Sequence, residues 1–260
     1  MVDNVLKITT PEPGILQISL NRPQQRNALN QNVLEALLST FESAKTNPAV
    51  KAILLTGEGQ AFCAGADIKE LMDLDGPSGY AFAQYGQAVF HTLELLGKPS
   101  LAAIHGFAFG GGAELAMAAT LRIATNTTQF GQPEIKLGVI PGFGGTQRLA
   151  RLIGKGRALE ICLTGRNFSA AQAYEWGFLN VITSENELLE QSMIILRQFI
   201  SFPSQSMHSI LTAVHHGYDL VLEDGFELEA SHFGLCCTTR DKQEGVSAFL
   251  EKRVPVFRGT

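Results

Sequence analysis

Apolar residues recur with two different periods along the first half of the chain, and each period predicts a different kind of element. Apolar and polar residues alternate over 5–9 and 15–20, on either side of a proline- and glycine-containing segment at 11–14, which predicts a strand–turn–strand. Over 30–45 the apolar residues return every three or four positions, which predicts a helix with Asn30 as its N-cap. Further strands are predicted at 52–56, 101–104 and 121–124, and further helices at 80–96 and 111–119. Alternating strands and helices with short connections predict parallel pairing and an α/β fold.

The pattern changes after about residue 186, where strand-like segments stop. Helices are predicted at 188–199, 205–215, 220–233 and 242–252, with breaks at Pro203 and Gly217. We therefore predict an α/β core over 1–187 and a helical region over 188–260, of the kind that often serves as an oligomerisation or lid element.

Composition and charge narrow the possible functions of the 260-residue chain. The net charge is −5 and no Lys/Arg cluster is present, which argues against a nucleic-acid partner. Residues 101–121 approach the length of a membrane span, but His105, Glu114 and the glycines favour a buried segment of a soluble protein over a membrane helix. The first ten residues lack the pattern of a signal peptide. Four cysteines without metal-binding spacing predict reduced thiols in a cytoplasmic protein: Cys63, Cys162, Cys236 and Cys237.

Two isolated acidic residues are the strongest candidates for chemistry. Glu114 is the only acidic residue between Glu94 and Glu134, and both Glu114 and Glu134 lie in glycine-rich surroundings. A glutamate is rarely buried unless it is paired or takes part in catalysis. The two carboxylates could therefore form an acid/base pair. The alternative is that Glu114 points from a core helix into solvent.

Glycines next to these acidic residues suggest backbone donors. Three glycines at 110–112 lie between the strand at 101–104 and the helix that carries Glu114, and they leave unpaired N–H groups at the start of that helix. Such groups can bind an anion or a carbonyl oxygen that becomes anionic. The small residues at 64–66 offer similar donors. The alternative is that the glycines only permit close packing of helix and sheet.

Other common catalytic motifs are absent from the sequence. It contains no Gly-x-Ser-x-Gly elbow, no Gly-x-x-x-x-Gly-Lys-[Ser/Thr] loop and no His-Glu-x-x-His helix. The glycine loop at 142–145 has Gln147 where a dinucleotide fingerprint would have its third glycine, so that match is weak.

Five segments together resemble the enoyl-CoA hydratase/isomerase (crotonase) family, in that family's order and spacing. They are Asn-Arg-Pro-x-x-x-Asn-Ala-Leu-Asn at 21–30, Phe-Cys-Ala-Gly-Ala-Asp-Ile-Lys at 62–69, Gly-x-x-x-Gly-Gly-Gly-x-Glu-Leu-Ala at 106–116, Phe-Gly-Gln-Pro-Glu-x-x-x-Gly-x-x-Pro-Gly-x-Gly-Gly-Thr-Gln-Arg-Leu at 130–149, and Glu-Gly-Val-Ser-Ala-Phe-Leu-Glu-Lys-Arg at 244–253. The resemblance implies a spiral of ββα units and a C-terminal helical region that builds homotrimers, often paired into hexamers.

The resemblance also implies the roles of the site residues. Backbone N–H groups of Ala66 and Gly111 would polarise the carbonyl of an acyl-CoA thioester. Glu114 would act as the main base on water, Glu134 would give the proton to Cα, and Gly142 would help to orient the loop of the second glutamate and the water. No metal or other cofactor is expected, because CoA is part of the substrate. CoA contacts are expected from Phe249 and Lys252 on one face of the last helix and from the segment 64–69, through Ala64, Ala66, Asp67, Ile68 and Lys69. For the two lysines, the alternative is a solvated charge.

The resemblance predicts an enoyl-CoA hydratase of fatty-acid β-oxidation. Such an enzyme adds water to the double bond of a trans-2-enoyl-CoA, reversibly and with syn geometry, and gives a 3-hydroxyacyl-CoA. The alternatives within this fold are a Δ3-Δ2 double-bond isomerase, another acyl-CoA lyase and a catalytically silent scaffold. Members that only move a double bond tend to keep one acidic residue, so the two glutamates favour hydration. A Clp-type serine peptidase shares the spiral architecture, but the sequence lacks a motif for its nucleophile.

Overall fold

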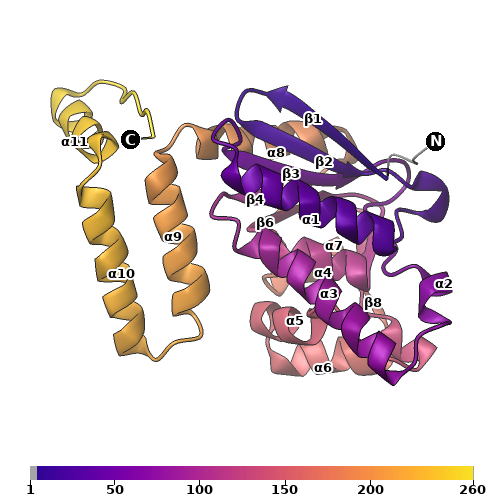
Figure 1. Ribbon diagram of the computed structural model, residues 1–260. Coiled ribbons are helices and arrows are strands. Elements are labelled where there is room, and N and C mark those ends of the chain that lie inside the picture. Colours follow the sequence, from indigo (N-terminus) through magenta and orange to yellow (C-terminus); the bar gives the residue numbers. More distant parts are fainter. Residues whose placement is uncertain (1–4, 260) are drawn as a thin grey trace.

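A six-stranded sheet forms the centre of the protein, whose computed structural model describes residues 5–259 (Figure 1). The strand order is β1-β2-β3-β4-β6-β9. β1 pairs antiparallel with β2, and all other neighbours pair parallel, as the alternation of strands and helices predicts. The strands are β1 (Leu6–Glu12), β2 (Ile15–Leu20), β3 (Ala52–Gly57), β4 (Ser100–Ile104), β6 (Leu121–Thr125) and β9 (Val181–Thr183).

A second, three-stranded sheet pairs β5 (Phe107–Phe109) with β7 (Gln129–Gly131) in parallel and β7 with β8 (Asn167–Ser169) antiparallel. β4 and β5 are consecutive, as are β6 and β7, so each of these units gives one strand to each sheet. A bridge between Cys63 and Ala108 extends the same arrangement to the segment after β3. The α/β spiral of ββα units that the sequence predicts is therefore confirmed.

Helices cover both faces of the large sheet. On one face, α1 (Gln31–Thr46) packs into the main core through residues such as Leu34 and Leu37. On the other face, α8 (Leu188–Ile200) places Leu188 and Leu196 against strand residues in a separate buried cluster. The remaining helices are η1 (Pro23–Gln25), α2 (Ile68–Leu71), α3 (Gly76–Glu94), α4 (Gly111–Ala118), η2 (Glu134–Leu137), α5 (Gly145–Ile153), α6 (Lys155–Thr164), α7 (Ala170–Glu175), η3 (Glu185–Glu187), α9 (Ser204–Gly217), α10 (Leu222–Cys237) and α11 (Arg240–Glu251).

Local chemistry explains where the helices begin. The Asn30 side chain accepts a hydrogen bond from the Val33 N–H at 3.0 Å, which confirms Asn30 as the N-cap of α1. α3 begins at Gly76 rather than at the predicted residue 80. The reason is a capping box in which Asp75 and Ser78 bind each other's backbone N–H groups.

The C-terminal helices differ from one another in how they are packed. α9 and α10 lie side by side and extend away from the sheets (Figure 1). α10 contains no buried residue, whereas α8 belongs to the core. The division of the chain at 187 and 188 stays a prediction. Within residues 5–259, no helix combines the length and the apolar character needed to cross a membrane.

Candidate active site

A cleft of about 1540 Å³ opens between α3, α4, η2, α5 with the loop that precedes it, and the C-terminal end of α9. Residues from separate parts of the chain line it, and they include all five of the predicted catalytic residues: Ala66, Gly111, Glu114, Glu134 and Gly142. The fold therefore gathers these residues around one cavity. The roles expected of them stay predictions.

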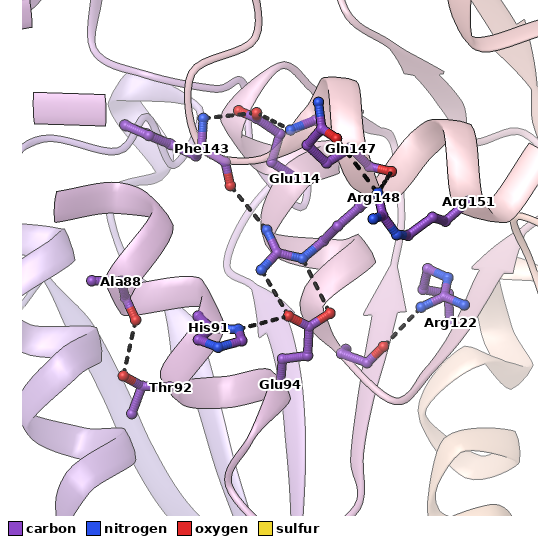
Figure 2. Close-up of polar contacts among 12 residues, drawn as sticks. Ala88, His91, Thr92, Glu94, Glu114, Arg122, Phe143, Gln147, Arg148 and Arg151 are labelled. Atoms are coloured by element: carbon purple, nitrogen blue, oxygen red, sulfur yellow. Dashed lines mark hydrogen bonds and ion pairs between the residues drawn. The ribbon is translucent and has the colours of Figure 1, made fainter. Parts of the chain in front are cut away.

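Glu114 is buried in the protein, with 1% of its surface exposed, so the alternative of a side chain pointing into solvent is wrong. Every residue of α4 is buried. Oε1 of Glu114 accepts hydrogen bonds from the N–H groups of Phe143 at 2.8 Å and Gly145 at 2.6 Å. Figure 2 shows the contact with Phe143. These two N–H groups stabilise a carboxylate that would otherwise lose its hydration without compensation.

Glu134 begins η2 and is half-buried. Its carboxylate packs directly on Gly110, where an added Cβ would lie 2.6 Å from Oε1 of Glu134. Gly110 also has a φ of +50°, a conformation that side chains disfavour. The buried Gln132 amide, oriented with its nitrogen toward Glu134, donates to Oε1 at 3.0 Å and to Oε2 at 3.1 Å. Glycine at 110 is thus required for the position of Glu134.

The environment keeps both carboxyl groups close to protonation at neutral pH. Burial, followed by the nearby Glu134 carboxylate, raises the pKa of Glu114 to about 8, although the N–H groups of Gly145 and Phe143 and the Arg148 guanidinium oppose the rise. Burial raises the pKa of Glu134 to about 7. Two carboxyl groups with such values hold about one proton between them near neutral pH, which suits a pair that must take one proton and give another.

The two predicted backbone donors lie next to each other. Gly111 is the first residue of α4, where no carbonyl of its own helix can accept its N–H. Among the hydrogen bonds of residues 5–259, none uses the N–H of Ala66. A Cβ built on Gly111 would lie 3.4 Å from the Ala66 nitrogen. Both residues line the cleft, so their N–H groups are candidates to bind one oxygen atom there.

The sequence did not indicate that Phe143 and Gly145 bind Glu114 through their backbone N–H groups. We expected Gly142 to orient the loop of Glu134, but the N–H groups that follow Gly142 bind Glu114. The Gly142 carbonyl accepts a hydrogen bond from Nε2 of Gln87 at 2.8 Å. A backbone donor can come from almost any residue type, so the sequence offers no side-chain signal for these contacts.

The residues predicted to bind CoA lie in two separate places. Of the segment 64–69, only Ala66 lines the cleft. Asp67 pairs with Arg22 at 3.1 Å and caps α2, while Ile68 and Lys69 are exposed. Figure 1 shows α11 on the opposite side of the protein from α2. Within one chain, α11 therefore lies far from the segment 64–69.

Phe249 and Lys252 do not share a helix face, so that prediction is wrong. α11 ends at Glu251, and Lys252 follows as its C-cap with a left-handed φ of 55°. Phe249 is 84% exposed and Lys252 is also exposed. Lys252 therefore lies beyond the last residue of the helix, in a backbone conformation that differs from the helical one.

Known proteins match this architecture over almost the whole chain. Residues 10–260 match the family described as Enoyl-CoA hydratase/isomerase. The chain is 38% identical to a crotonyl-CoA hydratase of Syntrophomonas wolfei, with 96% of each chain covered, and 37% identical to a short-chain-enoyl-CoA hydratase of Clostridium acetobutylicum, with 95% of each covered. It superimposes on the crystal structure of an enoyl-CoA hydratase from Bacillus anthracis with a TM-score of 0.95 and 35% identity, over 98% of this chain and 100% of that chain.

The fold and cleft define the class: a spiral α/β protein with two carboxyl groups and a pair of backbone donors around one cavity. The chain belongs to the enoyl-CoA hydratase/isomerase family. The resemblance inferred from the five sequence segments is confirmed.

Gly110→Ala tests the close packing of this glycine on Glu134. The new methyl group would displace the Glu134 carboxylate, and a shift of about 1 Å at a reacting group can cost roughly 10²-fold in rate. We therefore expect the turnover number to fall by about that factor in a folded protein, measured with a 2-enoyl-CoA. Gly154→Ala is the matched control, because Gly154 also has a positive φ of 83° but open space around it. Equal losses in both variants would mean that backbone strain, not contact with Glu134, is responsible.

Proposed function

We propose that the protein is an enoyl-CoA hydratase, which adds water across the double bond of a 2-enoyl-CoA thioester. The observation that carries the proposal is that Glu114 and Glu134 line one cleft together with the N–H groups of Ala66 and Gly111. Relatives that are named for this activity match the chain almost from end to end.

Glu114 takes a proton from water in the proposed reaction. The water oxygen then forms a bond to Cβ of the thioester, and the electrons of the double bond move toward the thioester carbonyl. The N–H groups of Phe143 and Gly145 bind Oε1 of Glu114, which leaves Oε2 for the water. The same hydrogen bonds favour the ionised form that a base requires, and so they oppose the rise in the pKa of Glu114 that burial causes.

Glu134 gives a proton to Cα, which completes the addition. Negative charge on the thioester oxygen develops before this step, and the N–H groups of Ala66 and Gly111 stabilise that charge. Fixed donors in a site that excludes water contribute most where charge develops, and the loss of one typically costs about 10²–10³ in rate. The addition is syn if both carboxyl groups act from the same face of the substrate. The thioester itself acidifies Cα, so the proposed mechanism uses no further cofactor.

Replacement of either glutamate by glutamine tests the two-carboxylate mechanism. Glutamine keeps the shape of the side chain but neither takes nor gives a proton in this role. We expect Glu114→Gln and Glu134→Gln each to reduce the hydration of crotonyl-CoA by roughly 10²–10⁴. The double variant should lose less than the product of the two factors, because both residues act on one water. Loss of the conjugated thioester absorbance measures the rate, and Glu42→Gln, an exposed glutamate on α1, is the control.

The same variants distinguish the alternative functions. A Δ3-Δ2 isomerase moves one proton along the chain and can work with one carboxylate. Glu114→Gln that hydrates at the wild-type rate while Glu134→Gln is inactive would overturn the two-carboxylate mechanism. A wild type that moves the double bond of a 3-enoyl-CoA but does not hydrate crotonyl-CoA would replace the hydratase by an isomerase. A wild-type protein that binds acyl-CoA without turning it over would indicate a scaffold.

The pKa values of the glutamates predict a bell-shaped dependence of kcat/KM on pH. Below about 7, both carboxyl groups are protonated and the base is lost; above about 8, both are ionised and the acid is lost. Between these values the pair holds one proton, and hydration uses the state in which Glu134 rather than Glu114 holds it. We therefore expect the maximum between these two values. Rates measured on both sides of this range check the prediction. A rate that stays constant from one side to the other would contradict a shared proton.

We also propose that the chain assembles into a homotrimer or a pair of trimers through its C-terminal helices. Large apolar side chains are exposed along this region, which is unusual unless another surface covers them. Those on α9 to α11 include Ile210, Val214, Phe226, Phe233, Leu235, Val246, Phe249 and Leu250. Assembly would also bring α11 of one chain toward another chain, where Phe249 and Lys252 could reach its CoA.

Charged substitutions on α10 test this assembly. Phe226→Asp and Phe233→Asp would place a carboxylate in the proposed interface, so we expect sedimentation to show a smaller particle than the trimer or hexamer of the wild type. Ile8→Asp, on an exposed position of β1, is the control and should leave the mass unchanged. A wild type that sediments as an active monomer would overturn the proposal.

We place the reaction in fatty-acid β-oxidation and the protein in the cytoplasm. Support for the compartment comes from the four cysteines, which are all free thiols. Recovery of the protein in another fraction of disrupted cells would contradict this placement.

A further inference from the structure

An ion pair in the wall of the cleft reaches Glu114 through the backbone. Arg148 of α5 binds Glu94 of α3 with two hydrogen bonds, from Nε to Oε1 at 3.2 Å and from Nη2 to Oε2 at 2.9 Å. Nη1 of Arg148 donates to the Phe143 carbonyl at 3.0 Å. The Phe143 N–H donates to Glu114, so Phe143 connects the ion pair to the base. Figure 2 shows the guanidinium between Glu94 and Phe143.

We propose that Arg148 and Glu94 are positioning residues for Glu114, which act by holding the backbone of Phe143. This inference rests on the proposed role of Glu114 as the base. Arg148 fits this role because its planar fork can bind a carboxylate with two donors and a carbonyl with a third. The two side chains are only 14% and 21% exposed, so water competes weakly for these bonds.

Helix α3 holds Phe143 at further points, so the ion pair completes a rigid support. The Phe143 ring packs against Phe82 and Phe90, with ring centroids 5.0 and 5.5 Å away. The ring also occupies the space where a side chain at Gly86 would be. Nε2 of Gln87 donates to the Gly142 carbonyl, which belongs to the same peptide group as the Phe143 N–H that binds Glu114. The peptide group on the other side of Phe143 has its carbonyl bound by Arg148.

The ion pair fixes the position of the Arg148 guanidinium, which a positive charge alone would not do. The Glu94 carboxylate lies close enough to Arg148 to offset its charge. Burial would raise the pKa of Glu94, but the Arg148 guanidinium holds it below its ordinary value. The contact with the Phe143 carbonyl depends on where the guanidinium is fixed. Lysine at position 148 would keep the charge but could not bind Glu94 twice and Phe143 once.

The first test measures kcat and KM for crotonyl-CoA in Arg148→Lys and Glu94→Gln. We expect kcat to fall by about 10- to 100-fold, since a displaced Phe143 N–H misplaces the base, while KM changes little. Arg166→Lys is the matched control. Arg166 also binds one glutamate, Glu160, through Nε and Nη2 and one backbone carbonyl, that of Asn167, through Nη1, but it does not line the cleft.

The second test separates positioning from a general loss of stability. Arg148→Lys is combined with Glu114→Gln, and kcat is compared in the two backgrounds. If Arg148 acts through Glu114, its replacement should cost no more than about twofold once the base is absent. If Arg148→Lys lowers kcat by the same factor in both backgrounds, the positioning role is overturned. It is also overturned if Arg148→Lys lowers the Tm but leaves kcat at the wild-type value. If Arg148→Lys does not fold, Glu94→Gln is combined with Glu114→Gln in its place and kcat is compared in the same way.

These measurements distinguish failure of this inference from failure of the proposed function. An active wild type with an inactive Glu114→Gln supports the function, and a wild-type kcat in Arg148→Lys then overturns only the positioning role. A wild type that does not hydrate crotonyl-CoA overturns the proposed function and the positioning role with it.

Discussion

The burial of one carboxyl group, Glu114, is the constraint on which the rest of the site depends. α4 is buried along its whole length, so Glu114 can be accommodated only if backbone donors replace the water it has lost. Phe143 and Gly145 provide those donors. The loop between them must therefore keep its shape, since a small displacement would leave a buried carboxylate or two buried N–H groups without partners. The same burial raises the pKa of Glu114 into the range where a carboxyl group can exchange protons at neutral pH.

The parallel pairing of β5 with β7 explains why both glutamates reach the same place. β5 pairs in parallel with β7, with Phe109 opposite Gly131, so these two strands end at the same edge of the small sheet. The Gly110 N–H then donates to the Gly131 carbonyl at 2.9 Å, which joins the two segments directly after the strands. α4 with Glu114 follows the first strand and η2 with Glu134 follows the second. Functional residues commonly collect where parallel strands end, because consecutive loops meet there.

Helix α3 links the stability of the protein to the geometry of its site. Val89 and Phe90 belong to the main core, while Gln87 and Glu94 on the same helix hold the loop around Phe143, directly or through Arg148. The core therefore fixes the helix, and the helix fixes the donors of Glu114. Rigid elements hold functional groups more precisely than free loops do, so this arrangement keeps the donors of Glu114 in place.

The sequence by itself determined the family, the α/β class, most of the long elements and the residues that meet in the cleft. Hydrophobic periodicity depends on local geometry, so α1 and β2 could be predicted from it, and the motif around Glu114 and Glu134 keeps a recognisable spacing. The roles of these residues and the division at 187 and 188 stay predictions. Only the tertiary structure decided the three-residue strands, which are too short to show a period, and the burial of Glu114. It also decided the contacts around the Phe143 backbone, because Glu94 and Arg148 are 54 positions apart and Arg148 binds a backbone carbonyl that any residue could provide. Contacts of this kind leave no local pattern, since they arise only when the completed fold brings distant elements together.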